Sequence, residues 1–133
     1  MSRVIKFRGW DATGQKGWVY GDLVHNQKVT KEGLEPRVMV GGYEVVPESV
    51  GQFTGLNDKN GKEIFEGDIV VVYDFTSVYA SKYQGVVRMY KCGWVVEYED
   101  KTFGIIAHPK LCFDDFADRK TEIIGTIYEQ NKK

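Results

Sequence analysis

Short runs of aromatic and β-branched residues, separated by glycines, constrain the fold of this chain more than any other sequence feature. The 133 residues include 15 glycines and only 3 prolines. Runs of about four to eight such residues, bounded by turn-forming residues, are typical of β-strands. The sequence therefore predicts an all-β fold, built from many short strands joined by tight turns.

The segment 54–70 carries the clearest turn signals. Asn60-Gly61 favours a type I′ hairpin turn, whose two central residues need positive φ angles. Glu66-Gly67-Asp68 predicts a second sharp corner, with an Asp side chain able to accept hydrogen bonds from nearby backbone N–H groups. A continuous apolar strand is expected over 69–73. We therefore assign a structural role, as a turn signature, to Asn60, Gly61, Gly67 and Asp68.

Other elements follow from the same spacing of apolar runs and turn residues. Further strands are expected over 4–10, 18–24, 38–40, 43–46, 50–53, 84–90, 94–98, 103–107 and 123–128. Residues 25–36 are polar and show no apolar period, so we expect an exposed loop there. A short helix is expected only within 109–119.

Charge and apolar content narrow the class of protein. Lys plus Arg (18) nearly balances Asp plus Glu (19), so the net charge is −1. Binding to duplex nucleic acid through bulk positive charge is therefore disfavoured. No apolar run approaches the roughly 20 residues of a membrane helix, and the N-terminus lacks a signal-peptide pattern. With only two cysteines, both expected to be reduced, these features predict a cytoplasmic protein with no membrane association.

Common catalytic motifs are missing from the sequence. It contains no phosphate loop, dinucleotide-binding glycine motif, nucleophile elbow, zinc-protease motif or paired C-x-x-C. His25 and His108 are its only histidines. We therefore expect a protein that is not an enzyme and that needs no cofactor.

Three near matches to metal or acid–base sites fail on spacing or context. If Gly61 held the sixth position of a calcium loop, Leu56 and Gly67 would occupy the first and twelfth, and neither carries a carboxylate. Zinc sites need a fourth ligand, and the soft-metal candidates are only three: Cys92, His108 and Cys112. The acidic residues Asp114, Asp115, Asp118 and Glu122 are interpreted as a solvated turn. The sequence predicts no metal.

The aromatic residues allow three interpretations. Three tryptophans and eight tyrosines can pack inside a small barrel, form a protein interface, or stack on the bases of a single-stranded nucleic acid. The candidate binding residues for the last function are Arg88, Tyr90, Lys91 and Trp94. A protein partner or self-association is favoured, and single-stranded nucleic acid is the alternative partner.

Three blocks of sequence resemble the YopX-like family. They are Ile5-Lys6-Phe7-Arg8-Gly9-Trp10-Asp11, the segment from Thr54 to Val70, and Glu122-Ile123-Ile124-Gly125-Thr126-Ile127-Tyr128-Glu129. The blocks occur in the family's order and span nearly the whole chain. The closing block departs slightly, because the family usually has Asn where this chain has Thr126 and Gln130.

The resemblance implies a small protein of the kind commonly encoded by bacteriophages and prophages, in a family with no established activity. It also implies a C-terminal part similar to an SH3-type β-barrel. We therefore expect a β-rich N-terminal lobe, residues 1–54, packed with an SH3-like barrel, residues 55–133. The expected function is that of a phage-derived accessory protein acting as a non-catalytic protein-interaction module.

Overall fold

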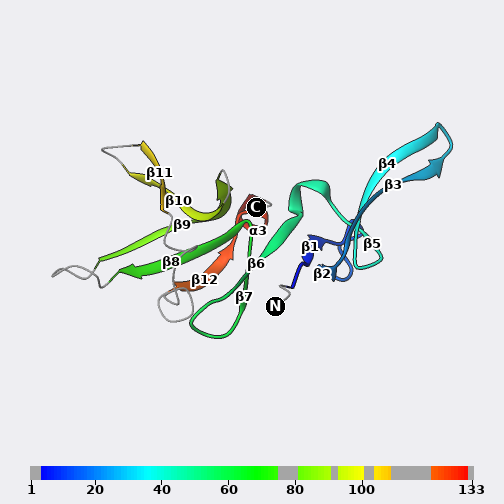
Figure 1. The fold of residues 1–133 in the computed structure, drawn as a ribbon. Coiled ribbons are helices and arrows are strands. Elements are labelled where there is room, and N and C mark those ends of the chain that lie inside the picture. The colour runs from blue at the N-terminus through cyan, green and yellow to red at the C-terminus, as the bar shows by residue number, and fades with distance from the viewer. Residues whose placement is uncertain (1–3, 75–80, 91–92, 101–103, 109–120, 132–133) are drawn as a thin grey trace. The chain divides into compact units, whose positions relative to one another are not determined.

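The chain folds into two units made almost entirely of antiparallel strands (Figure 1). A computed structural model describes residues 4–74, 81–90, 93–100, 104–108 and 121–131. Unit 1 comprises residues 1–53 and unit 2 comprises residues 54–133. The all-β prediction is confirmed.

Unit 1 contains two sets of paired strands. Its elements are β1 (Phe7–Trp10), β2 (Trp18–Gly21), β3 (Leu23–Thr30), β4 (Gly33–Val40), β5 (Tyr43–Glu44), the 3-10 turn η1 (Pro47–Ser49) and the start of β6 (Gly51–Asn57). β1 pairs with β2 and with the first residues of β6, while β3, β4 and β5 form a separate antiparallel sheet. The core of the unit is formed by Val19, Val40 and Val45, with Phe7, Leu23, Val38 and Val50 packed against it.

The expected exposed loop over 25–36 is wrong, because these residues form most of a long β-hairpin. β3 and β4 pair over eight positions, from Leu23 opposite Val40 to Thr30 opposite Gly33. In Figure 1 the hairpin extends well beyond β5, and we call its two strands the arm. The backbone ladder holds these residues as strands, although most of their side chains face water. Because so few of its side chains are buried, such a strand does not show the apolar alternation of a half-buried one.

Unit 2 is built on a five-stranded antiparallel sheet. The five strands of this sheet are β8 (Asp68–Asp74), β9 (Ser81–Tyr90), β10 (Gly93–Asp100), β11 (Gly104–His108) and β12 (Thr121–Thr126). Unit 2 also contains the end of β6 and the short strand β7 (Glu63–Phe65). The sheet order is β11-β10-β9-β8-β12, and β6 lies beside β7. Within the described residues no pairing joins β11 to β12, so a closed barrel is not seen there.

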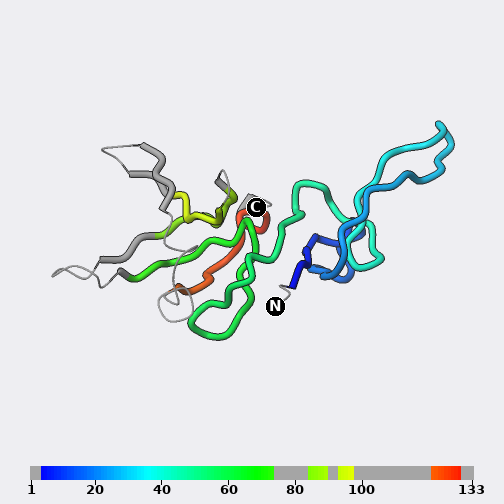
Figure 2. The backbone as a smooth tube through the Cα atoms, in the orientation of Figure 1, coloured from blue at the N-terminus to red at the C-terminus, as the bar shows by residue number. Residues whose placement is uncertain are grey.

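The closing strand begins and ends two residues earlier than the sequence predicts. β12 ends at Thr126, and the helical turn α3 (Ile127–Asn131) replaces the last expected strand residues. The smooth trace in Figure 2 shows the chain curling at this end. The short helix expected within 109–119 lies outside the described residues.

The core of unit 2 lies between the sheet and β7. It consists of Ile64, Val70, Val72, Val87 and Val96, with Leu56, Trp94 and Ile123 packed against it. Val70, Val87 and Ile64 are fully buried. The strands predicted from the runs 69–73, 84–90 and 94–98 therefore supply this core. Each contributes side chains from one face, since successive side chains of a strand point to opposite faces.

Candidate functional site

The first half of the turn signature, Asn60-Gly61, lies in a loop organised by the buried carboxylate of Asp58. The Asp58 Oδ1 accepts hydrogen bonds from the backbone N–H groups of Asn60 (2.8 Å) and Lys62 (2.9 Å). The Gly61 N–H donates to the Asp58 carbonyl at 3.0 Å. Lys59 and Asn60 are therefore the central residues of the turn. Gly61, with φ of +81°, follows them, and Asn60-Gly61 is not the central pair that the sequence predicts.

Asp58 also joins this loop to the last strand of unit 2. Its second carboxylate oxygen, Oδ2, accepts a hydrogen bond from the Ile123 N–H at 3.1 Å. The neighbouring Lys59 N–H donates to the Thr121 carbonyl at 2.8 Å. Only 2% of the Asp58 surface is exposed. The carboxylate is therefore used as a backbone acceptor, and its role is structural.

The corner at Gly67-Asp68 also has a structural role, as the sequence predicts. Asp68 is fully buried, and its Oδ2 accepts a hydrogen bond from the Phe65 N–H at 2.8 Å. Gly67 has φ of +91°, and its N–H donates to the Val87 carbonyl at 2.8 Å. The similar Gly-Asp pair at Asp22 differs, because the Asp22 side chain is exposed.

The structure does not bring the predicted binding residues together as one surface. Arg88 lies opposite Val95 in the β9–β10 register, whereas Trp94 lies opposite Met89. Since side chains alternate between the two faces of a sheet, Arg88 and Trp94 point to opposite faces. Trp94 packs against the core, and the Arg88 Nε lies 3.3 Å from the Glu97 Oε1.

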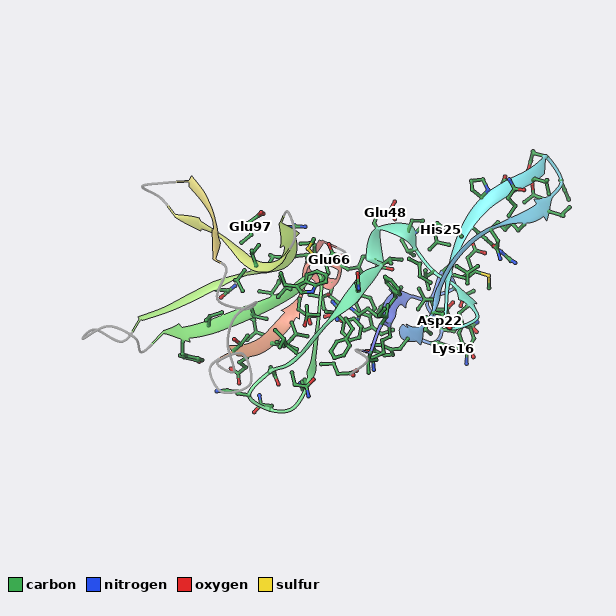
Figure 3. All side chains as sticks on the ribbon, viewed as in Figure 1. Lys16, Asp22, His25, Glu48, Glu66 and Glu97 are labelled. Atoms are coloured by element: carbon green, nitrogen blue, oxygen red, sulfur yellow. The ribbon has the colours of Figure 1, made fainter. Side chains whose placement is uncertain are left out.

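The other two predicted binding residues are only partly described. Tyr90 is the last residue of β9, opposite Gly93, and Lys91 lies outside the described residues. Figure 3 labels Glu97, the ion-pair partner of Arg88. Base stacking by these four residues therefore stays a prediction, and the part of it that needs Arg88 and Trp94 on one face is not supported.

Most of the candidate metal and acidic residues lie outside the described part of the chain. This applies to Cys92, Cys112, Asp114, Asp115 and Asp118. Glu122 lies on β12, where its Oε2 is 3.5 Å from the Lys59 Nζ. Among the residues that the structure describes, no group of three or more His, Cys, Asp or Glu side chains is placed to hold a metal ion.

A second carboxylate-centred turn lies between β1 and β2. The Asp11 Oδ2 accepts hydrogen bonds from the Thr13 hydroxyl (2.7 Å) and the Lys16 N–H (3.1 Å). The Thr13 hydroxyl is the main cause that lowers the pKa of Asp11 below its ordinary value of 3.8, with the Lys16 N–H adding to it and desolvation opposing it. Figure 3 labels Lys16 in this turn.

The lowered pKa of Asp11 gives a pH-dependent contribution to stability. A carboxyl whose pKa is lower in the folded state stabilises that state above its unfolded pKa, and the contribution is lost as pH falls through the folded value. We expect wild type to lose stability below pH 3.8 more steeply than Thr13→Ala, in which the main cause of the shift is removed. Thermal unfolding from neutral pH into the acid range measures this, and equal slopes for the two proteins would contradict it.

The arm has two chemically different faces. One face, which we call the apolar arm face, is formed by Leu23, His25, Gln27, Val29, Leu34, Pro36, Val38 and Val40. Val40 at its base belongs to the core of unit 1, and Leu23 and Val38 pack against that core. Towards the tip the same face is uncovered: Val29 is 84% exposed and Leu34, directly opposite it, is 64% exposed.

Beyond Val24 and Met39 at its base, the opposite face of the arm is polar and carries one hydrogen bond and one ion pair. The Arg37 Nε donates to the Asn26 Oδ1 at 2.7 Å, and the Lys28 Nζ lies 2.9 Å from the Glu44 Oε2 on β5. Glu35 is on this face as well. The charged residues of β3 and β4, histidine aside, therefore all project on the side away from the apolar arm face.

Sequence reasoning missed the apolar arm face, although a weak signal for it exists. Positions 34, 36, 38 and 40 are all apolar, which is the alternation of a strand with one apolar face. Gln27 and His25 interrupt the matching alternation on β3, and Pro36 favours a loop when the sequence is considered alone. Proline is tolerated on an edge strand, where its missing N–H faces outward.

Fold and comparisons together define a class for this protein. It is an antiparallel β protein of two units, joined by a strand that contributes to both. The chain matches the model of the YopX protein family over residues 6–133, and it belongs to that family.

A solved structure of another protein has the same fold. The crystal structure of protein EF1440 from Enterococcus faecalis is 23% identical in sequence, with a TM-score of 0.51, and the match covers 98% of each chain. The comparison with curated proteins found no match. Within the described residues, no helix combines the length and apolar character needed to cross a membrane.

Proposed function

We propose that this protein is a non-catalytic protein-interaction module that docks through the apolar arm face. A phage- or prophage-encoded accessory protein working in the cytoplasm is the proposed setting, which rests on the family resemblance and the cysteine content. The observation that carries the proposal is the exposed apolar pair at the tip of the arm, Val29 and Leu34.

Exposure of this pair is unusual because of where it occurs. Single apolar residues on a protein surface are common and need no explanation. Here Val29 and Leu34 lie on the same face of the arm as Val40, which is buried in the core at the base of the arm. Together with the exposed Pro36 they form one apolar strip. A contiguous apolar strip with a polar rim is typical of a protein interaction site.

The arm is also held in a defined conformation, which favours binding. An isolated two-stranded hairpin is marginally stable in water. The ion pair of Lys28 with Glu44 and the hydrogen bond between Arg37 and Asn26 add side-chain links on the charged side. At the tip, the Thr30 hydroxyl donates to the Gly33 carbonyl at 3.1 Å. A preorganised strip loses less conformational entropy when a partner binds.

Use of the buried carboxylates as structural acceptors supports the non-catalytic part of the proposal. Catalytic acids and bases usually line a cleft, with a side-chain oxygen directed at the substrate. Asp58 and Asp68 instead accept backbone N–H groups of their own loops. Asp11 does the same in its turn.

We also propose that unit 2 belongs to the SH3-type barrel class. Strands β8 to β11 follow one another as neighbours, and β12 returns beside β8. A meander whose last strand returns to its first is compatible with a small antiparallel barrel, which closes when its edge strands meet. Backbone hydrogen-exchange protection on both edges, β11 and β12, would support closure, and fast exchange along both would contradict it.

The docking proposal is tested by a double substitution, Val29→Lys with Leu34→Lys. Because both side chains are exposed, we expect unchanged folding, and a loss of at least about tenfold in affinity for a protein partner. The matched control is Val24→Lys with Ile124→Lys, two exposed aliphatic positions outside the apolar arm face. Quantitative pull-down followed by cross-linking identifies partners retained by wild type and control.

The expected partner set is lost from the double variant and kept by the control. Circular dichroism and thermal unfolding of all three proteins exclude misfolding as the cause. If wild type, the arm variant and the control retain the same proteins, the apolar arm face is not the docking surface.

A further inference from the structure

The apolar arm face has a chemistry that restricts what covers it. Positions 23–40 are all described, and no Lys, Arg, Asp or Glu lies on this face of β3 and β4. Its one titratable group is His25. A partner therefore gains nothing by presenting charge here, and an uncharged apolar surface of similar width fits best.

We infer that the partner at this face is a second copy of this chain, with two arms packing their apolar faces together around a two-fold axis. The inference rests on the proposed function and names the partner of the same surface. Two copies meet without repulsion, because the charges of Lys28, Glu35 and Arg37 project on the other side of each arm. A two-fold interface uses the same patch on both partners.

The dimensions of the arm set the strength of this packing. The base of the apolar arm face is already buried against the core of unit 1. About half of the eight residue pairs is therefore uncovered, a face of roughly 14 by 10 Å, or about 140 Å² in plane. An equal hairpin face covers it fully when the two pack about 10 Å apart. The area is well below the roughly 800 Å² that each partner buries in a standard interface. The dimer is therefore weak and reversible.

Sedimentation equilibrium of the purified full chain, from micromolar to millimolar concentration, measures this association. We expect the average mass to rise from the monomer value of 15.2 kDa towards twice that value. The variant Val29→Lys with Leu34→Lys places like charges across the two-fold axis, and its dissociation constant is expected to rise at least about a hundredfold. The control Val24→Lys with Ile124→Lys is expected to associate as wild type does.

A charge-reversal pair makes the test specific for face-to-face packing. The variant Val29→Glu with Leu34→Glu is expected to be monomeric alone, as is the lysine variant. Mixed one to one, the two are expected to form a heterodimer, because lysines of one arm then face glutamates of the other. Recovery on mixing also shows that both variants are folded.

The outcomes separate this inference from the proposed function. A wild-type chain that stays monomeric at millimolar concentration overturns the inference, and so does association that neither variant weakens. If wild type is monomeric yet its arm face retains another protein, the proposed function stands and only the second copy is wrong. If the chain is monomeric and no partner depends on the arm, both fail.

Discussion

Replacing Asp58 with alanine is expected to lower the free energy of unfolding by about 3 kcal/mol, because three backbone N–H groups lose a charged acceptor. The donors are those of Asn60, Lys62 and Ile123. Water can replace the carboxylate at the exposed loop, but the bond to Ile123 joins two distant segments. Urea unfolding followed by tryptophan fluorescence measures the change as a shift in midpoint at constant slope.

Two further variants separate charge from shape and position. Asp58→Asn keeps the size of the side chain, but one of its two positions becomes an amide donor facing a backbone N–H. We expect Asp58→Asn to lower the free energy of unfolding by about half as much as Asp58→Ala does. Asp22→Ala removes an exposed carboxylate after another glycine and is expected to change stability by less than about 0.5 kcal/mol. Equal effects of Asp58→Ala and Asp22→Ala would show that the Asp58 contacts contribute little.

Gly85→Ala is expected to destabilise the protein by about 3 kcal/mol through overpacking. Gly85 is buried in β9, where an added Cβ would lie 2.5 Å from the Glu97 carbonyl oxygen and 2.7 Å from the Val96 Cγ1. The nearer atom belongs to the backbone of β10, so relief requires the two strands to separate. The lower entropy of the unfolded alanine chain stabilises by only about 0.4–1 kcal/mol, so the clash dominates.

The matched control is a glycine on another strand of the same sheet. Gly125 in β12 has open space around its Cα, with no heavy atom within 4 Å of an added Cβ, and its φ is outside the left-handed region. Gly125→Ala is expected to leave stability unchanged or to raise it by up to about 1 kcal/mol. Thermal unfolding of the two variants measures the contrast. If Gly85→Ala is as stable as Gly125→Ala, the close approach of β9 to β10 is not present in solution.

Local sequence patterns predicted much of the fold. The runs 69–73, 84–90 and 94–98 form β8, β9 and β10, and the corner expected at Gly67 has a positive φ. These predictions succeeded because strand alternation and left-handed turn residues are recorded within a few neighbouring positions. The end of β12 was missed, since Ile127 begins a helical turn in a run that is apolar enough for a strand.

The candidate site was harder to predict than the fold. Arg88 and Trp94 are close in sequence, but the register of β9 with β10 sends their side chains to opposite faces. The exposed pair Val29 and Leu34 lay inside a segment expected to be a loop. Register and exposure depend on which strands pair, and a one-residue shift exchanges the two faces of a strand.

The sequence by itself determined the family, the all-β class and the two glycine corners at Gly61 and Gly67, because these depend on short motifs and on positive φ angles. Only the tertiary structure decided that Asp58 bonds to Ile123, 65 residues away, and that the arm leaves Val29 and Leu34 uncovered. The first depends on the pairing that places β12 beside the loop, and the second on the register of β3 with β4. Backbone pairing uses the N–H and C=O groups that almost every residue carries, so side-chain patterns record it only weakly.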